Sequence, residues 1–304
     1  MYKKEFIIFI SRLALLMLLL STNVISEEVY KYKDANGRWI FTDKRPLNLS
    51  DDEYISVEYK NEKRKLEPRI YVLKKEGRSS LIADNPYHAP VEFLVKSSNV
   101  VSGLKTYIVP AASQKILFTK LQKIGKYKYH WRLGDPSASE DDYLYKFPVS
   151  SKSSHKITQA FHGKFSHSKQ PSMFAVDVAL PMRTNISAAR SGVVIWVKDD
   201  YHMGGKSDFF RDKANYVKVL HRDGTYATYA HILAGTAAVK PGDVVQTGDL
   251  LAKSGSSGYS TGPHLHFVIR KNSGFKTIST PFRFIANDGE IYTPKKGMVI
   301  GSMN

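Results

Sequence analysis

The second half of the chain is a series of short apolar runs, each closed by a tight turn, and this pattern restricts the fold more than any other feature. Asp223-Gly224 separates two of the runs and is a strong hairpin signal. No amphipathic helical pattern interrupts the series. The runs cover residues 175–179, 192–197, 216–221, 225–231, 244–246, 250–253 and 264–270. We therefore expect a mainly β protein in which residues 151–304 form an antiparallel β-sheet domain with a C-terminal extension.

Three further segments precede this domain. Residues 27–49 pair two strand-like runs around Asp34-Ala35-Asn36-Gly37, which predicts a small β-hairpin domain. Residues 50–85 are charged and lack sustained periodicity, which predicts a linker that includes at most one strand, at residues 69–73. Residues 86–150 alternate apolar and polar positions between Ser, Asn, Gly and Pro, which predicts a β accessory module of sandwich type.

The first 26 residues have the layout of a signal peptide. Lys3 and Lys4 precede an apolar run at residues 13–20, and small or tolerated residues follow at Val24 and Ser26. Arg12 makes the apolar stretch short for a bilayer span, although an uncleaved anchor is the alternative. The sequence has no cysteine, which removes disulfides, thiolate ligands and a lipoprotein anchor. We expect export, with the periplasm of a Gram-negative bacterium as the destination.

The chain is strongly basic, with a formal net charge of +17. Its Lys and Arg residues are spread along the sequence, apart from clusters at residues 60–65 and 74–75, and no nucleic-acid-reading module accompanies them. A solvated basic surface that is attracted to an anionic envelope polymer or membrane face fits this distribution. We therefore expect no nucleic-acid partner and a peripheral association with the envelope.

Two histidines stand two residues apart in His264-Leu265-His266, at the start of a strand-like run. Strand side chains alternate, so both imidazoles should face one side, about 6.6 Å apart along the strand. A lone pair of this kind is weak evidence, because surface histidines occur on strands without a ligand. The same alternation places Tyr229 and His231 on one face at the end of another run.

Asp177 interrupts an otherwise apolar strand, where an unpaired carboxylate is costly to bury. Its partner is either a metal ion or a Lys or Arg side chain. His167 lies upstream in a loop rich in Gly, Ser and Lys. Two imidazoles and one carboxylate are a set that binds catalytic zinc, with an open position for water and further groups to move protons.

The segment from about residue 157 to 270 resembles the lysostaphin/LytM-type zinc endopeptidases, which hydrolyse peptidoglycan. The matching strings are Phe165-Ser166-His167, Ala175-Val176-Asp177, Tyr229-Ala230-His231-Ile232, Val239-Lys240-Pro241-Gly242-Asp243 and Ser260-Thr261-Gly262-Pro263-His264-Leu265-His266-Phe267. The resemblance implies a duplicated-hybrid-motif-like fold and one Zn²⁺ held by His167, Asp177 and His266. It assigns His231 and His264 to the metal-bound water and the developing oxyanion, without deciding which is the general base.

The resemblance also implies a function, and it leaves one alternative function open. The substrate would be the amide bonds of peptidoglycan stem peptides or cross-links. The alternative is a non-catalytic module of the same fold that binds peptidoglycan or activates another hydrolase. The small N-terminal segment resembles a domain of unknown function found in exported proteins, through residues 29–32, Asp34, Gly37 and Phe41-Thr42-Asp43.

The spacing between His167 and Asp177 is longer than in many family members, so His162 is the rival first ligand. The other histidines, His155, His202 and His221, lack motif context and are expected at the surface. The glycine-rich loop at residues 255–262 lacks the Lys-Ser/Thr ending and helix of a P-loop, and Ser256 and Ser257 lack the elbow of a nucleophilic serine. We expect this loop to be a turn that leads into His264.

Overall fold

The computed structural model describes residues 26–35, 37, 39–42, 44–50, 52–60, 67–98, 103–150 and 153–300. Apart from Ser26, the expected signal peptide of residues 1–26 lies outside the described residues. No helix in the part of the chain that is described is long and apolar enough to cross a membrane. The chain divides into two units, residues 1–65 and 66–304, which are considered separately.

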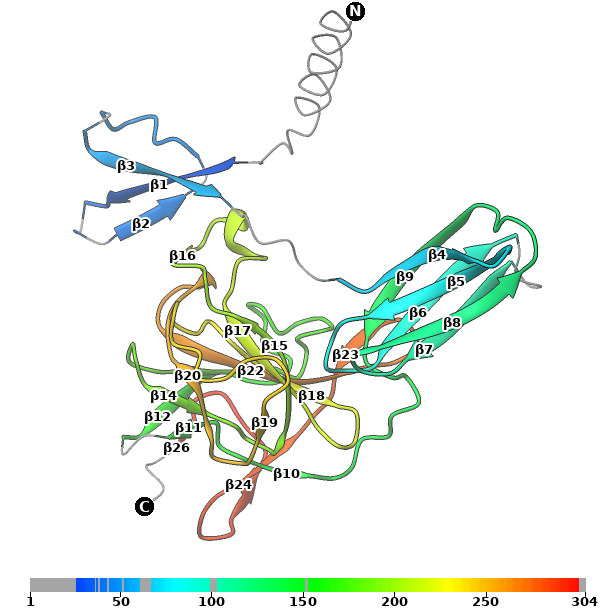
Figure 1. Cartoon of the computed structure of the whole chain (residues 1–304). Helices are drawn as coiled ribbons and strands as arrows, with labels where there is room; N and C mark the ends of the chain where they lie inside the picture. The colour runs from blue at the N-terminus through cyan, green and yellow to red at the C-terminus, as the bar shows by residue number, and fades with distance from the viewer. Residues whose placement is uncertain are drawn as a thin grey trace, which may run out of the picture. The chain divides into compact units, whose positions relative to one another are not determined.

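The first unit is a three-stranded antiparallel sheet in the order β2-β1-β3 (Figure 1). Strands β1 (Ser26–Lys33) and β2 (Trp39–Thr42) form the expected hairpin, and Asp34 O accepts from Gly37 N at 2.9 Å. The third strand, β3 (Tyr54–Lys60), falls in the segment that we expected to be a linker. The Tyr54 ring contacts the Tyr30 ring edge-on at 5.4 Å, so β3 is stabilised by a strand outside its own segment.

The second unit begins with a β module of two three-stranded sheets, which are shown in cyan and green in Figure 1. Their orders are β4-β5-β8 and β7-β6-β9. The strands are β4 (Arg69–Lys75), β5 (Arg78–Asn85), β6 (Val91–Ser97), β7 (Leu104–Val109), β8 (Ser113–Lys120) and β9 (Tyr127–Leu133). Leu81, Phe93 and Val95 are fully buried in their common core. The module is thus of sandwich type.

The first two strands of this module also lie in the expected linker: β4 corresponds to the possible strand at residues 69–73, whereas β5 was not expected. Strand β4 has charged residues at both ends, yet Ile70 is buried, and β5 buries Leu81 and Ala83. These apolar positions find their partners in strands that come later in the chain, so local periodicity does not reveal them. Residues 50–85 therefore contain β3, β4 and β5 in place of a structureless connection.

The module packs against the larger domain through specific contacts. The Tyr87 and Trp196 rings lie 4.7 Å apart, and Ile195 and Tyr226 belong to the module's apolar cluster. Glu92 Oε2 accepts from Asn272 Nδ2 at 2.6 Å and from Phe275 N at 2.8 Å. A buried carboxylate thus fixes the module to the C-terminal part of the chain.

The larger domain is built on a nine-stranded sheet (Figure 1). Its order is β19-β15-β17-β18-β22-β13-β12-β26, with β23 paired to β22. The strands are β12 (His155–Gln159), β13 (Val176–Ala179), β15 (Gly192–Lys198), β17 (Tyr216–Leu220), β18 (Tyr226–Ala230), β19 (Val244–Val245), β22 (His264–Asn272), β23 (Thr277–Ser279) and β26 (Val299–Ile300). All of the pairs are antiparallel, and no α-helix occurs in the described ranges, which confirms the mainly β prediction.

Small strand pairs complete the domain. Strands β10 (Leu144–Lys146), β24 (Arg283–Ile285) and β25 (Ile291–Tyr292) form one sheet, and β11 (Val149–Ser150), β14 (Asn185–Ser187) and β20 (Leu250–Lys253) form another. Strand β16 (Gly204–Gly205) pairs with β21 (Gly258–Tyr259), and a short 3₁₀ helix, η2, spans Asp208–Phe210.

Two predictions about individual strands are confirmed. Strands β17 and β18 form the hairpin around Asp223-Gly224, where Gly224 has a φ of +81° that favours glycine. On β22, Leu265, Phe267 and Ile269 are at most 1% exposed and point into the core, so His264 and His266 face the opposite side. The sheet therefore has one apolar face and one face that carries polar groups.

Candidate metal centre

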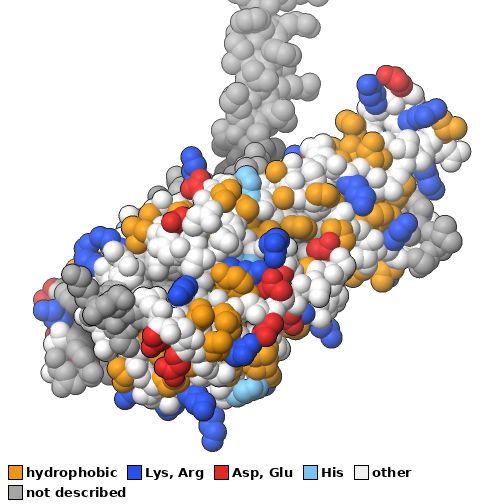
Figure 2. Space-filling model, turned by 90° about the horizontal axis from the view of Figure 1, so that it is seen from below, with side chains coloured by type: hydrophobic (Ala, Val, Ile, Leu, Met, Phe, Trp, Pro, Cys, Tyr) orange, Lys and Arg blue, Asp and Glu red, His pale blue; other side chains and the backbone are white. Residues whose placement is uncertain are grey.

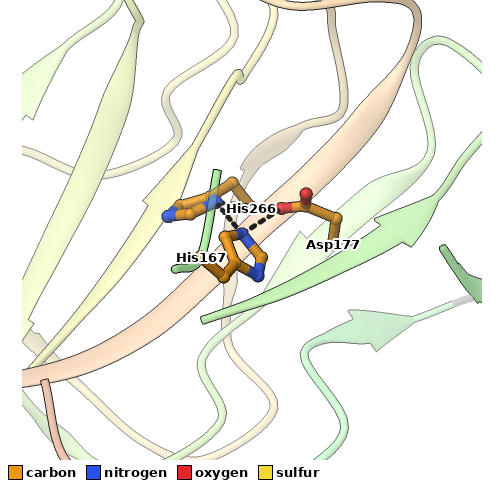
Figure 3. Close-up of side chains that lie close together, drawn as sticks. All are labelled: His167, Asp177 and His266. Carbon is orange, nitrogen blue, oxygen red and sulfur yellow. Dashed lines mark hydrogen bonds and ion pairs between the residues drawn. The ribbon is translucent and has the colours of Figure 1, made fainter. Parts of the chain in front are cut away.

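His167, Asp177 and His266 converge on the polar face of the sheet (Figure 3). Asp177 comes from β13 and His266 from β22, where the two residues are direct antiparallel partners. His167 comes from the loop after β12 and is fully buried. One nitrogen or oxygen atom of each residue lies within 4.8 Å of the others. Residues 99 positions apart in the chain thus meet at one point.

The atoms of this cluster have spacings that suit a small cation. Asp177 Oδ1 lies 2.9 Å from His266 Nδ1 and 3.3 Å from His167 Nε2, and the two histidine nitrogens are 3.3 Å apart. Ligands about 2.1 Å from a tetrahedral zinc ion are separated by about 3.4 Å. Two imidazoles and a carboxylate are also a donor set of catalytic zinc sites. The residues present therefore fit Zn²⁺.

Hydrogen bonds behind the cluster orient its donor atoms. Ala160 O accepts from His167 Nδ1 at 3.1 Å, so the Nε2 atom of a neutral His167 presents a lone pair to Asp177. A lone pair and a carboxylate oxygen 3.3 Å apart are two acceptors facing each other. A proton or a metal ion must lie between them.

Gln159, which no sequence motif singles out, fixes the other carboxylate oxygen. Its Nε2 donates to Asp177 Oδ2 at 2.8 Å, and its Oε1 accepts from the backbone of Phe165 and Ser166. Gly163 lies so close to the Gln159 side chain that a Cβ atom would collide with it. The only sequence signal was a polar residue at an inward position of β12, where the burial alternates.

His264 and His231 lie beside the cluster. Their ring centroids are 4.4 Å apart, and His264 Nε2 is 4.0 Å from Asp177 Oδ1. Gly262 O accepts from His264 Nδ1 at 2.8 Å, and Ser257 O accepts from His231 Nδ1 at 2.6 Å. Both rings are thus anchored through Nδ1, which leaves Nε2 available for proton transfer.

The expected common face of Tyr229 and His231 is wrong. Tyr229 is fully buried, and its hydroxyl accepts from Ala189 N at 2.8 Å. Strand β18 ends at Ala230, and His231 has a φ of +65°. This left-handed conformation is costly for a residue other than glycine, and it breaks the alternation so that the His231 ring reaches His264. Such strain is typical of functional sites.

Burial and charge set the protonation of the site. Burial acts to raise the pKa of Asp177, but its bonds with His167 and His266 outweigh this effect and hold the pKa well below the usual value. Burial, helped by the neighbouring histidines, lowers the pKa of His231 to about 3. Burial also lowers the pKa of His266. His231 is therefore neutral at pH 7, as a proton acceptor must be.

The structure separates the remaining histidines. His162 is exposed, has its ring against Phe174 and lies outside the cluster, so His167 is the residue that joins Asp177 and His266. His202 is exposed, as expected. His155 and His221 are only 5% and 2% exposed, so their expected surface position is wrong. His221 is held by Ser191 O, at 3.0 Å from Nδ1, and by the Tyr145 ring, which are both distant in sequence.

The loop at residues 255–262 is the expected turn into His264. Gly255 and His264 form an antiparallel bridge, and no helix follows within the described residues. The Ser257 hydroxyl is buried and donates to Ile232 O at 3.0 Å. Ser256 Oγ contacts Ser260 Oγ at 3.0 Å. Both serines stabilise the loop that anchors His231 and His264.

A groove of about 1390 Å³ runs over the cluster. Asp177, His231, His264 and His266 lie in its wall together with Gln159. The Phe165 and Tyr259 rings stack at 6.3 Å beside it, and Phe165 is 67% exposed. The cluster is therefore open to a large ligand.

Comparison with protein families gives two matches. Residues 172–277 match the model of Peptidase family M23, and residues 16–65 match a Domain of unknown function, DUF4124. The first match includes Asp177, His231, His264 and His266, whereas His167 lies just before it. The second confirms the resemblance of the small N-terminal segment.

Three curated proteins are similar to the chain. An uncharacterized metalloprotease of Buchnera aphidicola subsp. Baizongia pistaciae is 26% identical over 207 residues, which are 67% of this chain and 49% of that protein. Lysostaphin of Staphylococcus simulans is 31% identical over 118 residues, or 38% and 22% of the two chains. The peptidoglycan DD-endopeptidase ShyA of Vibrio cholerae is 30% identical over 93 residues, or 31% and 19%.

The chain thus spans about half or less of the length of these relatives. Among solved structures, the catalytic domain of lysostaphin from Staphylococcus simulans aligns at 25% identity and a TM-score of 0.27, covering 42% of this chain and 79% of that domain. The part of the sheet domain that presents Asp177, His231, His264 and His266 therefore matches a peptidase family M23 domain over residues 172–277.

Proposed function

We propose that the chain is an exported zinc metalloendopeptidase that hydrolyses amide bonds in peptidoglycan stem peptides or cross-links. The observation that carries this proposal is the meeting of His167 Nε2, Asp177 Oδ1 and His266 Nδ1 within 3.3 Å of one another, a spacing and a donor set that suit a zinc ion. No Lys or Arg forms an ion pair with Asp177 among the described residues. His167, Asp177 and His266 would therefore hold the ion.

When it is bound, zinc supplies a Lewis acid and lowers the pKa of its water to about 7. The chain's own groups do the rest. His231 or His264 accepts a proton at Nε2, since each Nδ1 is tied to a backbone carbonyl. Protonated, the same ring can stabilise developing negative charge or donate to the leaving amine. Gln159 keeps the Asp177 carboxylate from rotating.

The substrate class rests on the relatives and on charge. Lysostaphin and a peptidoglycan DD-endopeptidase are among the relatives, at 31% and 30% identity over 118 and 93 residues. Lys and Arg side chains are dispersed over the face shown in Figure 2, among apolar and acidic groups, and the net charge of +17 favours an anionic wall polymer. Export to the periplasm is supported by the basic and apolar residues of the N-terminus.

Digestion of purified peptidoglycan tests the proposal. The zinc-loaded protein should convert cross-linked muropeptides to smaller products, a chelator should stop this reaction, and added zinc should restore it. Asp177→Asn should be inactive, whereas Asp212→Asn, which changes an exposed carboxylate of the same groove, should keep its activity. If folded, zinc-loaded protein leaves the muropeptides unchanged, the chain is a non-catalytic binding or activating module.

The first ligand is tested by a matched pair of variants. His167→Ala should strongly reduce the zinc content of the purified protein, because it removes a buried donor of the cluster. His162→Ala changes an exposed histidine of the same loop and should leave the zinc content unchanged. Loss of zinc from His162→Ala alone would reassign the ligand.

A further inference from the structure

Beyond the metal cluster, the polar face of the sheet carries a second group of polar side chains. On β22 the positions that alternate with the core residues are His264, His266, Val268 and Arg270. Val268 pairs with Thr228 of β18, and Thr228 pairs with Lys218 of β17. Lys218, Thr228 and Arg270 all line the groove that holds the metal cluster.

Lys218 has no carboxylate partner among the described residues. Its ammonium group lies over three aromatic rings, at 4.8 Å from Tyr216, 5.3 Å from Trp196 and 5.9 Å from Tyr226. These rings stabilise a cation from one side and leave its other side to the groove. Burial, together with the charge of Arg270, lowers the pKa of Lys218 to about 8. The structure thus places two cations near each other without an anion.

Arg270 is held in place but not neutralised. Its Nε donates to Pro171 O at 2.8 Å, and its Nη2 donates to Ser172 Oγ at 3.1 Å. Both acceptors are neutral, and no carboxylate pairs with Arg270 in the described part of the chain. Arg190, in contrast, is paired with both Asp141 and Asp223. The orientation of Arg270 is therefore fixed while its charge remains available.

Thr228 supplies an independent sign of a missing ligand. It is 3% exposed, and its Oγ1 atom has no hydrogen-bond partner among the described residues. A buried hydroxyl without a partner costs about 1–3 kcal/mol, so such groups are rare in native proteins. Its position between Lys218 and Val268 sets this hydroxyl at the groove floor beside the two cations.

The charge of the groove also favours an anionic ligand. Its lining includes six cationic residues and two acidic ones, Asp177 and Asp212. Asp177 is bound to the histidines, and Asp212 pairs with Lys213 at 3.5 Å. The cationic residues are Lys164, Arg211, Lys218, Arg270, Lys295 and Lys296. An anionic ligand would complete the groove.

We propose that Lys218, Thr228 and Arg270 form a carboxylate-binding subsite, so that the substrate is a peptide with a free carboxylate a few residues from the scissile amide. Val268 and Arg270 lie two and four residues from His266, or about 7–13 Å along the strand. An extended peptide covers this distance with two to four residues. This inference rests on the proposed hydrolysis at the His167, Asp177 and His266 cluster.

The carboxylate has two sources, a side chain of the peptide or its C-terminus. Synthetic cross-linked stem peptides distinguish them: one set carries both carboxylates, one has the side-chain carboxylates amidated, and one has the C-terminus amidated. Zinc-loaded wild-type protein should cleave the acidic peptide with a kcat/KM about 10- to 100-fold above that for one amidated peptide, as expected for charge-assisted hydrogen bonds. The amidated set that is cleaved more slowly than the acidic peptide identifies which carboxylate the subsite binds.

Variants test whether the preference for the acidic peptide over the amidated one depends on the subsite. Lys218→Met should remove most of this preference, mainly through KM, and Lys218→Arg should restore it. Thr228→Val keeps the side-chain volume and should reduce the preference several-fold. Lys295→Met is the matched control, since Lys295 is an exposed cation of the same groove. Thermal melting verifies that each variant folds.

Binding separates this inference from the proposed function. Asp177→Asn cannot hydrolyse the peptides if the metal proposal is correct, yet it retains the subsite and should bind the acidic peptide about 10- to 100-fold more tightly than the amidated one in calorimetry. Equal affinity for the two peptides, or a preference that survives Lys218→Met, would overturn the subsite. If the wild-type protein binds the acidic peptide tightly but does not hydrolyse it, the proposed enzymatic activity is refuted and the subsite is not.

Discussion

The charges of two carboxylates of the same domain, Asp177 and Asp223, are compensated by different kinds of partner. Asp223 pairs with Arg190, whose Nη1 lies 2.8 Å from Oδ2, and it accepts from the Thr225 hydroxyl at 2.7 Å. Among the described residues, Asp177 has the neutral amide of Gln159 on Oδ2 and histidines around Oδ1, at 2.9 Å from His266 and 3.3 Å from His167, but no Lys or Arg. Asp223 thus has a permanently charged partner, Arg190, whereas Asp177 has none in the described part of the chain.

The difference teaches how to tell a structural ion pair from a binding site. In both cases burial acts to raise the pKa of the carboxyl group and its partners outweigh this effect, so that the pKa of Asp223 falls to about 2. A low pKa therefore does not separate the two residues. The identity of the partner does, because imidazoles are metal ligands whereas a guanidinium is not.

The largest expected effect is on activity. Asp177→Asn should lower kcat/KM by about 1000-fold or more, since it removes a donor from the ion that activates the attacking water. The free energy of unfolding of the metal-free protein should fall, because the contacts with His167 and His266 that hold the pKa of Asp177 low stabilise its ionised form in the folded state. Steady-state kinetics and urea unfolding measure the two quantities. A variant with near-normal kcat/KM would place the chemistry elsewhere.

Arg190→Met should have the opposite profile. It leaves the Asp223 carboxylate buried without its cation, which should lower the free energy of unfolding by about 3–5 kcal/mol. Zinc content and kcat/KM of the folded fraction should not change. Arg283→Met is the control, since Arg283 pairs with an exposed carboxylate, Asp142, and its loss should cost no more than about 1 kcal/mol. Equal destabilisation by both variants would contradict the structural role of the Arg190 pair.

The gain in stability on zinc binding should differ between variants of the two carboxylate sites. At a zinc concentration 100 times the dissociation constant, the metal-free wild-type protein should gain about 2.7 kcal/mol. Arg190→Met should gain the same amount, and Asp177→Asn should gain almost nothing. Thermal melting with and without zinc measures this gain. A full gain in Asp177→Asn would mean that the ion binds at another site.

The smallest expected effect concerns His221, the buried histidine near Asp223. Burial, helped by the charge of Arg190, lowers its pKa from 6.5 to about 4. The unfolded chain takes up the proton near pH 6.5, whereas the folded protein does so only near pH 4, so stability is lost as the pH falls through this window. From pH 7 to 5 the loss should be roughly 2 kcal/mol.

His221→Asn removes this titration while it keeps an amide donor that can reach Ser191 O. The unfolding free energy of the variant should therefore fall less between pH 7 and 5 than that of wild type, by roughly 2 kcal/mol. His202→Asn, which changes an exposed histidine, should follow wild type. Parallel pH profiles for wild type and His221→Asn would show that His221 is accessible to protons in the folded state.

The sequence predicts the parts of the site that depend on local geometry. Strand alternation alone places His264 and His266 together, and an isolated carboxylate in an apolar strand marks Asp177. The mainly β architecture and the hairpin at Asp223-Gly224 follow from turn chemistry in the same way. These features need only information that is carried by neighbouring residues.

The remaining features depend on contacts between distant residues. His231 reaches the site because a φ of +65° ends the strand, which the alternation of side chains does not reveal. His221 is buried by Ser191 and Tyr145, and β4 and β5 are completed by later strands. His167 was assigned from resemblance, and its hydrogen bond to Ala160 O explains how a loop residue reaches the cluster.

The most direct test is anomalous X-ray diffraction from crystals grown with zinc, recorded on both sides of the zinc absorption edge. We expect one strong peak per chain, about 2.0–2.2 Å from a ring nitrogen of His167, a ring nitrogen of His266 and a carboxylate oxygen of Asp177. The absence of a peak between these residues, or a peak coordinated by His162 instead of His167, would contradict the proposed metal centre.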